Sequence, residues 1–230
     1  MKIYSFRPAE KIDAALMSKY HVTNLPLVSI MPQKPDITEL TEYDSIAFLS
    51  SSAAKHFFLH SDIKIPEDMA IFAVGRKTAQ EIPVKEDRII IPPIHDSLHV
   101  AEKIIETGSK KVIVPRGGSH TDAFEKILNS AHIIMKETVV YTYGKGEGQN
   151  LLNEIEFSPD DTVLLFTSPM EVEIFHEITG QKFLNLKTVP LGNPTLNAMK
   201  SAGFVNILKR KYVDFQSMIQ EVSKNSGEWI

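Results

Sequence analysis

The sequence contains no cysteine. Without thiols, the chain can form no disulfide, no thiolate nucleophile and no cysteine-ligated metal site. It also lacks an apolar run of about 18 residues, which a membrane-spanning helix would need. No basic leader precedes an apolar stretch, since Met1 opens directly onto an expected strand at residues 2–6. We therefore expect a cytoplasmic protein that has no membrane partner.

An excess of positive charge is missing too. The 230 residues include 25 Lys and Arg against 29 Asp and Glu, which gives a net charge of −4 and a pI near 6.1. Proteins that bind nucleic acid usually present a basic face to the phosphates. The charge therefore argues against a nucleic-acid partner, while the hydrophobic content of 43% is ordinary for a globular protein.

Signatures of several catalytic classes are absent as well. There is no GxSxG elbow, no GxGxxG fingerprint and no paired-carboxylate pattern, so hydrolase and dinucleotide-binding functions have no motif behind them. The histidines show neither HExxH nor His-x-His spacing, so we expect no metal site and interpret them as isolated surface residues. They are His21, His56, His60, His95, His99, His120, His132 and His176.

What the sequence does contain is a repeated unit. Residues 44–58 (DSIAFLSSSAAKHFF) and 161–175 (DTVLLFTSPMEVEIF) each read as a short apolar strand that passes through Ser or Thr into a helix. Three sets of positions recur. Phe48 and Ser50 match Phe166 and Ser168 at an offset of 118, and Gly75 and Thr78 match Gly192 and Thr195 at 117. Lys2 and Arg7 match Lys111 and Arg116 at an offset of 109. The repeat predicts two copies of one α/β unit.

Alternating strands and helices predict parallel sheets in both copies. We expect a discontinuous first domain at residues 1–30 and 145–230 and a second at residues 38–138, with crossings at 31–37 and 139–144 and a cleft between the domains. The crossing after residue 139 runs into Gly144-Lys145-Gly146-Glu147-Gly148. This run lacks the GxxxxGK spacing of a phosphate-binding loop, so we interpret it as a flexible linker.

Five further elements are expected from local patterns. Residues 24–30, 88–91 and 205–208 read as strands, and Ser97 reads as the cap of a helix. The last helix should bury Phe215, Met218, Ile219 and Val222 on one face.

Ser and Thr residues at the strand-to-helix junctions have two interpretations. They can simply cap the helices by accepting backbone N–H bonds. They can also mark an anion site, because free N–H groups and the positive end of the helix dipole point the same way, at the carboxyl ends of the strands. Four such residues in a matched arrangement favour the second interpretation, with an anionic, polycarboxylate ligand.

Seven short motifs occur in order along the chain: Arg7-Pro8, Phe48-x-Ser50, Val74-Gly75-x-x-Thr78-Ala79, Pro115-Arg116-Gly117-Gly118, Val140-Tyr141, Phe166-Thr167-Ser168-Pro169 and Gly192-x-x-Thr195. Together they resemble the uroporphyrinogen-III synthase family over essentially the whole chain. Ser51 and Pro194 depart from the residues usual there, which leaves the geometry of those two loops open. The resemblance implies two α/β domains with parallel sheets, joined by a two-stranded connection, with an active site in the interdomain cleft and no cofactor.

The resemblance also implies an activity and a set of residues. A monomeric lyase of this family closes the linear tetrapyrrole hydroxymethylbilane to uroporphyrinogen III, with inversion of ring D and loss of water, in heme biosynthesis. Tyr141 would be the acid near the departing hydroxyl. The substrate-binding residues would be Arg7, Ser50, Ser52, Gly75, Thr78, Arg116, Gly117, Gly118, Thr167, Ser168 and Thr195.

Two alternatives stay open at this point. Strand alternation places Val139, Tyr141 and Tyr143 on one face, so both tyrosine rings could serve only to pack the crossing. The whole protein could also be a cytosolic, non-enzymatic two-domain binding protein that holds a small polyanionic ligand with the same helix starts.

Overall fold

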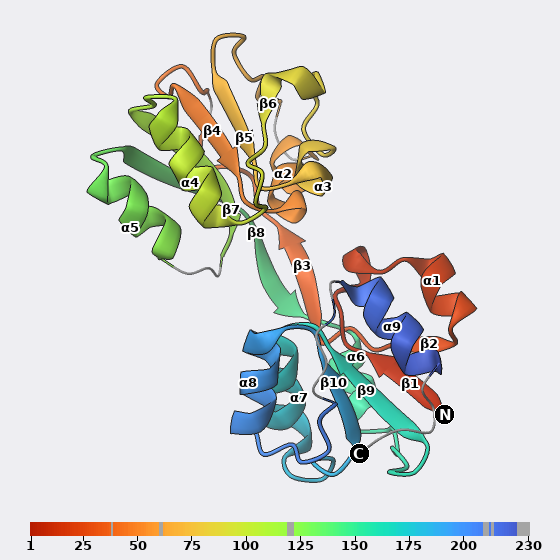
Figure 1. Cartoon of the computed structure of the whole chain (residues 1–230). Coiled ribbons are helices and arrows are strands. Elements are labelled where there is room, and N and C mark those ends of the chain that lie inside the picture. The colour runs from red at the N-terminus through yellow and green to blue at the C-terminus, as the bar shows by residue number, and fades with distance from the viewer. Residues whose placement is uncertain (38, 60–61, 119–121, 209–211, 213, 225–230) are drawn as a thin grey trace. The chain divides into compact units, whose positions relative to one another are not determined.

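The computed structural model describes residues 1–37, 39–59, 62–118, 122–208, 212 and 214–224 (Figure 1). The chain divides into two compact units: unit 1 comprises residues 1–30 and 144–230, and unit 2 comprises residues 31–143. Thr38, the expected start of the second domain, lies outside the described residues, as do His60 and His120. Within the described ranges, no helix is both long and apolar enough to cross a membrane.

Unit 1 is built on a four-stranded parallel sheet with the strand order β10-β9-β1-β2. Its strands are β1 (Lys2–Ser5), β2 (Val22–Asn24), β9 (Thr162–Phe166) and β10 (Lys187–Pro190). Its helices are the 3-10 turn η1 (Ala9–Lys11), α1 (Ala14–Lys19), α6 (Gly148–Leu152), α7 (Pro169–Thr179), α8 (Asn193–Ser201) and α9 (Phe215–Lys224).

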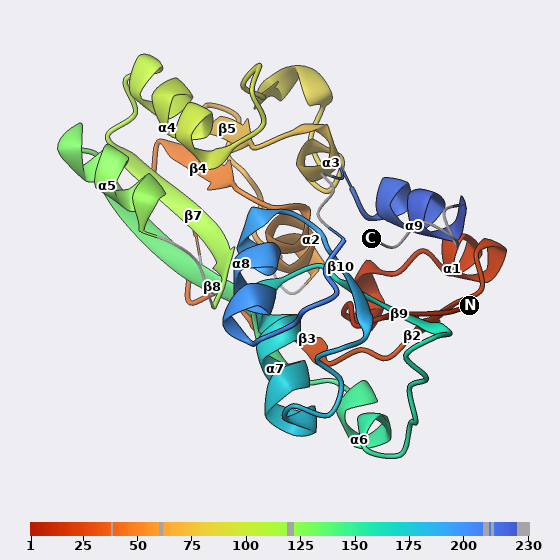
Figure 2. The same cartoon turned by 60° about the horizontal axis from the view of Figure 1, so that its bottom comes forward.

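Helices cover both faces of the unit 1 sheet (Figures 1 and 2). On one face, Ile3 and Val163 pack with Met17 of α1 and with the apolar stripe of α9. That stripe is the predicted one, because Phe215, Met218, Ile219 and Val222 are all buried. On the other face, the rings of Phe6, Phe166 and Phe175 form a buried aromatic cluster against α7.

Unit 2 contains most of a six-stranded sheet with the order β3-β8-β7-β4-β5-β6. Its strands are β3 (Val28–Pro32), β4 (Ser45–Phe48), β5 (Ala70–Ala73), β6 (Ile89–Ile90), β7 (Lys111–Gly117) and β8 (Ile134–Lys145). Its helices are α2 (Ser51–Leu59), α3 (Arg76–Ala79), the 3-10 turn η2 (Glu86–Arg88), α4 (Ser97–Glu106) and α5 (Ala123–Ser130).

Helices cover both faces of this sheet (Figure 2). Ala47 and Phe72 of the strands pack with Ile104 of α4 and Leu128 of α5. Phe48, the next residue along β4, points the other way and meets the ring of Phe57 in α2 at 5.6 Å. Strands that bury both faces explain the continuous apolar runs in the sequence.

The strand registers confirm the internal repeat. In unit 2, Ile46 of β4 pairs with Ile71 of β5, and in unit 1 the corresponding residues of β9 and β10, Leu164 and Thr188, also pair. Ser45 pairs with Val112, and its counterpart Val163 pairs with Ile3. The strand order β8-β7-β4-β5 of unit 2 therefore matches the order β2-β1-β9-β10 of unit 1. The two halves follow each other in opposite order along the chain: β1 and β2 precede β9 and β10 in unit 1, whereas their counterparts β7 and β8 follow β4 and β5 in unit 2.

Three expected elements differ from those observed. The expected strand at residues 24–30 is two strands, interrupted at Pro26, which has no N–H to donate. Residues 205–208 make one isolated bridge, from Ile207 to Thr188, instead of a strand. The cap of α4 is Asp96 and not Ser97: the Asp96 carboxylate accepts the N–H of His99 at 2.9 Å.

The flexible-linker interpretation of residues 144–148 is wrong. Gly144 and Lys145 extend β8, and α6 begins at Gly148. The N–H groups of Gly146 and Gly148 donate to the carbonyls of Leu27 and Pro26 at 3.1 and 2.9 Å. A Cβ on Gly146 would lie only 2.1 Å from the Pro26 oxygen, so the glycines serve close backbone packing.

Candidate functional site

The predicted site residues lie at the carboxyl ends of parallel strands in the two sheets. In unit 1 they follow β1, β9 and β10. In unit 2 they follow β4 and β5 or lie at the end of β7, and Tyr141 lies within β8, paired with Gly117 at the end of β7. Parallel strands end at the same edge, so each unit brings its own set together. The unit 1 set is Arg7, Thr167, Ser168 and Thr195, and the unit 2 set is Ser50, Ser52, Gly75, Thr78, Arg116, Gly117, Gly118 and Tyr141.

The start of α7 carries a carboxylate of the chain itself. Ser168 is the N-cap, and its hydroxyl accepts the N–H of Glu171 at 3.3 Å. The Glu171 carboxylate in turn accepts the N–H and the hydroxyl of Thr167, at 2.6 and 2.7 Å. Thr167 and Ser168 are thus engaged within the fold. Sequence reasoning missed Glu171, although Ser168-x-x-Glu171 is a capping-box pattern.

Glu171 is a buried carboxylate that has two partly buried cations near it. It is only 2% exposed, and burial raises the pKa of its carboxyl, against the opposing effects of the Thr167 hydrogen bonds and the Arg7 charge. Burial lowers the pKa of Arg7, whose guanidinium lies 4.4 Å from the centre of the Phe215 ring. Burial, followed by the nearby Arg7 charge, also lowers the pKa of Lys11. Two cations therefore accompany one carboxylate at the end of β1.

The equivalent place in unit 2 is built differently. Ser50 accepts the N–H of Ala53 at 3.1 Å, as Ser168 accepts that of Glu171. Ala53 occupies the repeat position of Glu171, so α2 has no acid there. The counterpart of Arg7 is Arg116, 5% exposed, whose guanidinium forms an ion pair with Glu137 of β8 at 2.6 Å. Burial lowers the pKa of Arg116.

Two of the three predicted threonines are buried in the short helix α3 and at the start of α8. Thr195 is 1% exposed, and its hydroxyl donates to the carbonyl of Leu191 at 3.1 Å. Thr78 is 3% exposed, and its N–H donates to the carbonyl of Gly75 at 3.0 Å. Gly75 and Gly192 are the N-cap residues of α3 and α8.

Tyr141 is buried, with 6% of its surface exposed. Its ring contacts the rings of His56 and Tyr143, with centroid distances of 5.4 and 5.6 Å. The rings of Tyr141 and Tyr143 lie together, as expected, with Tyr141 buried and Tyr143 partly buried, whereas Val139 is 40% exposed. The register between β7 and β8 shifts between Arg116 and Gly117, so that Gly117 pairs with Tyr141 and strict alternation is broken.

His56 corrects the prediction that the histidines are isolated surface residues. It lies in α2 and is 7% exposed. No spacing motif singles it out. Its place on the inner face of the helix, one residue before Phe57, was the only available signal. Among the residues described, no group of three or more His, Asp or Glu side chains could hold a metal ion.

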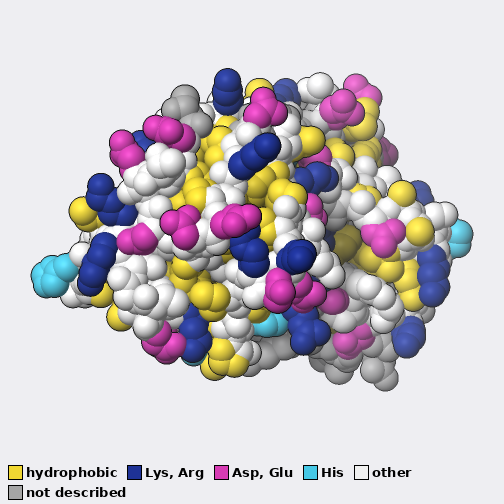
Figure 3. All heavy atoms as spheres, turned by 90° about the horizontal axis from the view of Figure 1, so that it is seen from above, with side chains coloured by type: hydrophobic (Ala, Val, Ile, Leu, Met, Phe, Trp, Pro, Cys, Tyr) yellow, Lys and Arg dark blue, Asp and Glu magenta, His cyan; other side chains and the backbone are white. Residues whose placement is uncertain are grey.

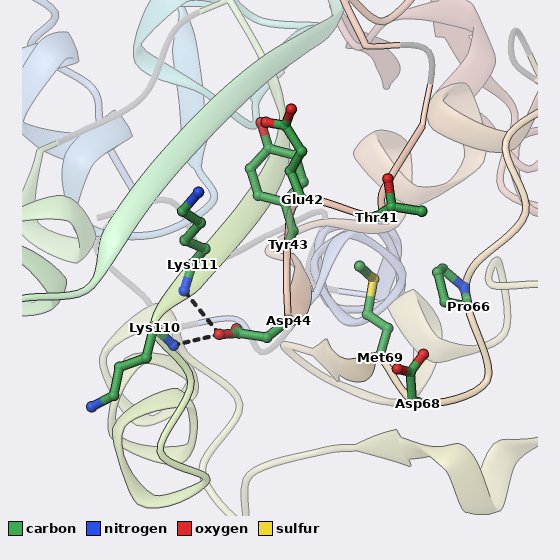
Figure 4. A pocket seen from close by; sticks show the side chains of 9 residues that line it. All are labelled: Thr41, Glu42, Tyr43, Asp44, Pro66, Asp68, Met69, Lys110 and Lys111. Carbon is green, nitrogen blue, oxygen red and sulfur yellow. Dashed lines mark hydrogen bonds between the residues drawn. The ribbon is translucent and has the colours of Figure 1, made fainter.

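A cavity of about 500 Å³ lies at the opposite edge of the unit 2 sheet, where β4, β5 and β7 begin (Figure 4). The Asp44 carboxylate there accepts the N–H groups of Lys110 and Lys111 at 2.7 and 3.1 Å. None of the predicted site residues lines this cavity. The Asp44 carboxylate therefore joins the start of β4 to the start of β7.

Comparison with known proteins decides the family. The family model described as uroporphyrinogen-III synthase HemD matches residues 14–220. The chain belongs to the uroporphyrinogen-III synthase family. The curated proteins searched gave no match.

Solved structures support the synthase fold. The uroporphyrinogen-III synthetase of Helicobacter pylori is 17% identical, with a TM-score of 0.68 over 97% of this chain and 98% of that one. A mutant uroporphyrinogen III synthase of Thermus thermophilus is 13% identical, with a TM-score of 0.57 over 98% of each chain. At this identity the structures bear on the fold alone, and they confirm the predicted mixed α/β architecture with parallel sheets.

Proposed function

We propose that the chain is a uroporphyrinogen-III synthase, a lyase that closes hydroxymethylbilane to uroporphyrinogen III in heme biosynthesis. The observation that carries this proposal is the family match over residues 14–220. The polar set at the carboxyl edges of both sheets supports it. We also propose that the protein acts as a cytoplasmic monomer. The molar mass from light scattering would test the monomeric state.

The substrate carries eight carboxylates, yet the protein has a net charge of −4. On the face drawn in Figure 3, Lys and Arg side chains alternate with Asp and Glu, and neither sign forms a continuous patch. Recognition therefore depends on local groups: helix-start N–H groups, the partly buried Arg7 and the buried Arg116. Helix starts favour anions without a net positive charge.

The two helix starts are not equivalent in this role. At α7 the donors of Thr167 already hold the Glu171 carboxylate, whereas α2 has Ala53 at the corresponding position. A substrate carboxylate therefore meets an internal acid near Ser168 but none near Ser50. We propose that Ser50 and Ser52 bind a substrate carboxylate more directly than Thr167 and Ser168 do.

The chemical step begins when the terminal hydroxyl of hydroxymethylbilane accepts a proton and leaves as water. The resulting azafulvenium cation is attacked by the substituted carbon of ring D, which gives a spiro intermediate. The bond from that carbon to the methylene bridge of ring C then breaks, the methylene bonds to the free α-carbon of ring D, and loss of a proton gives the inverted ring. The sequence involves no net oxidation, so it needs no redox cofactor. Holding the chain bent toward the crowded carbon is the main task of the enzyme.

Tyr141 is the proposed proton donor to the departing hydroxyl. A general acid contributes typically ~10²–10⁴-fold to the rate. The Tyr141→Phe substitution keeps the ring and removes only the donor, so kcat should fall at least ~10-fold while the free energy of unfolding changes by less than ~1 kcal/mol. An unchanged kcat in Tyr141→Phe would mean that another group donates the proton. An equally large loss of kcat in Tyr143→Phe would mean the same.

The test of the activity uses freshly prepared hydroxymethylbilane, which closes without an enzyme to the uninverted isomer I. With purified protein present, the product should be isomer III. With heat-denatured protein, it should remain isomer I. Isomer I alone, formed at the uncatalysed rate, would refute the proposal. Binding of hydroxymethylbilane without isomer III would instead support a non-enzymatic binding protein.

A further inference from the structure

The Tyr141 ring is enclosed on several sides by unit 2. His56 of α2 and Tyr143 of β8 contact the ring, and Gly117 of β7 lies against its hydroxyl end. The backbone is fixed as well, because the N–H of Gly118 donates to the carbonyl of Tyr141 at 3.0 Å. The phenol therefore has little freedom to change its direction.

Gly117 is a requirement of this arrangement. A Cβ at Gly117 would lie 2.5 Å from Cζ of Tyr141, 2.6 Å from Cε2 and 2.7 Å from the hydroxyl oxygen. These atoms belong to a rigid ring, and its strand is paired to β7, so the ring would have to turn as a whole. The neighbouring Gly118 differs, because its Cβ would meet only the Thr142 methyl group at 3.3 Å.

His56 supports the ring from the helix side. The imidazole is 7% exposed, and its ring plane is tilted by 47° to that of Tyr141. A buried aromatic pair at 5.4 Å has a defined geometry, and its loss leaves space into which the tyrosine ring can move.

We propose that Gly117 and His56 are positioning residues for the Tyr141 phenol: Gly117 by carrying no side chain, and His56 by packing against the ring. This inference rests on the proposed role of Tyr141 as proton donor. It gives Gly117 a function that differs from direct substrate binding, and it gives His56 a function that no motif assigned.

A double-mutant cycle separates positioning from substrate contact. Gly117→Ala should lower kcat at least ~10-fold with a smaller change in KM, because the donor is misdirected. In a Tyr141→Phe background the same substitution should cost little further kcat, since the proton donor is already gone. Additive losses would show that Gly117 acts independently of Tyr141 and would overturn the proposal.

His56 is tested by graded substitutions. His56→Ala should lower kcat several-fold, and His56→Phe, which restores a ring, should recover most of the loss. Full kcat in His56→Ala, or a loss in His56→Phe as large as in His56→Ala, would overturn the packing role. This pair also covers the case in which Gly117→Ala does not fold.

A measurement that does not depend on activity separates this inference from the proposed function. In protein with ¹³C-labelled tyrosine rings, the Tyr141 resonance is assigned by its absence in Tyr141→Phe. It should shift in Gly117→Ala and His56→Ala and stay in place in Gly118→Ala. If the resonance shifts as expected but Tyr141→Phe retains full kcat, the ring is positioned as described and the proton-donor role fails. An unmoved Tyr141 resonance in both variants would overturn the positioning itself.

Discussion

At the scale of single residues, the two copies of the repeat place different acids near equivalent arginines. Arg7 has Glu171 of a helix near it, whereas Arg116 forms an ion pair with Glu137 of a strand. Asn24 holds the place in β2 that Glu137 holds in β8, since Asn24 pairs with Ser5 and Glu137 with Val114. A buried charge must have a partner, but either neighbouring element can supply it.

The raised pKa of Glu171 leads to a prediction about how stability depends on pH. Its folded pKa lies above the ordinary value of 4.5, mainly because of burial, so the folded state binds this proton more tightly than the unfolded state does. Its stabilising contribution is therefore complete below the unfolded pKa and is lost as pH rises through the folded pKa. The difference in free energy of unfolding between wild type and Glu171→Gln should decrease from about pH 4 to pH 7.

Urea denaturation at a series of pH values measures that difference. The glutamine variant is the matched control, because all other titrating groups are common to both proteins. A difference that grows with pH would mean that the charges of Arg7 and Lys11 outweigh the cost of burying the carboxylate.

At the scale of elements, the junction between β8 and α6 shows why a glycine-rich run need not be a linker. Glycines such as Gly146 and Gly148, which permit flexibility, also permit two backbones to approach closely. Sequence alone does not distinguish these uses here, because the second backbone, at residues 25–27, lies more than 100 positions away in the chain.

The Gly146→Ala substitution tests this packing. Its Cβ would lie 2.1 Å from the Pro26 oxygen and 2.7 Å from the Leu27 carbonyl carbon, so the backbone of unit 1 must move. We expect a loss of ~1–3 kcal/mol in the free energy of unfolding, measured by urea denaturation. Glu147→Ala, at an exposed neighbouring position, should stay within ~0.5 kcal/mol of wild type. Equal stability of the two variants would restore the flexible-linker interpretation.

At the scale of the whole molecule, the sequence predicted the α/β class and the internal repeat, because the same strand-to-helix patterns occur twice along the chain. It did not predict what depends on contacts between distant residues. The burial of His56, the register shift that seats Tyr141 against Gly117, and the pairing of Arg116 with Glu137 all arise where separate elements meet. Local patterns specify an element, whereas these features need the assembled sheet.

The charge of the whole molecule leads to a prediction about salt. Protein and proposed substrate are both anionic, so their long-range interaction is repulsive, and the distance over which it acts shrinks from about 30 Å at 0.01 M salt to about 8 Å at 0.15 M. The proposed contacts to helix-start N–H groups, to the partly buried Arg7 and to the buried Arg116 would act over short distances and be screened far less. Adding NaCl over this range should therefore raise kcat/KM or leave it unchanged, within about threefold.

Steady-state assays at constant pH measure this dependence, and sodium sulfate at matched ionic strength is the control. If repulsion dominates, both salts should act alike, because only ionic strength matters. Stronger inhibition by sulfate would indicate competition at an anion site, superimposed on the screening. A steep fall of kcat/KM with either salt is the behaviour of a basic surface that attracts a polyanion, and it would contradict recognition by local groups on a protein of net charge −4.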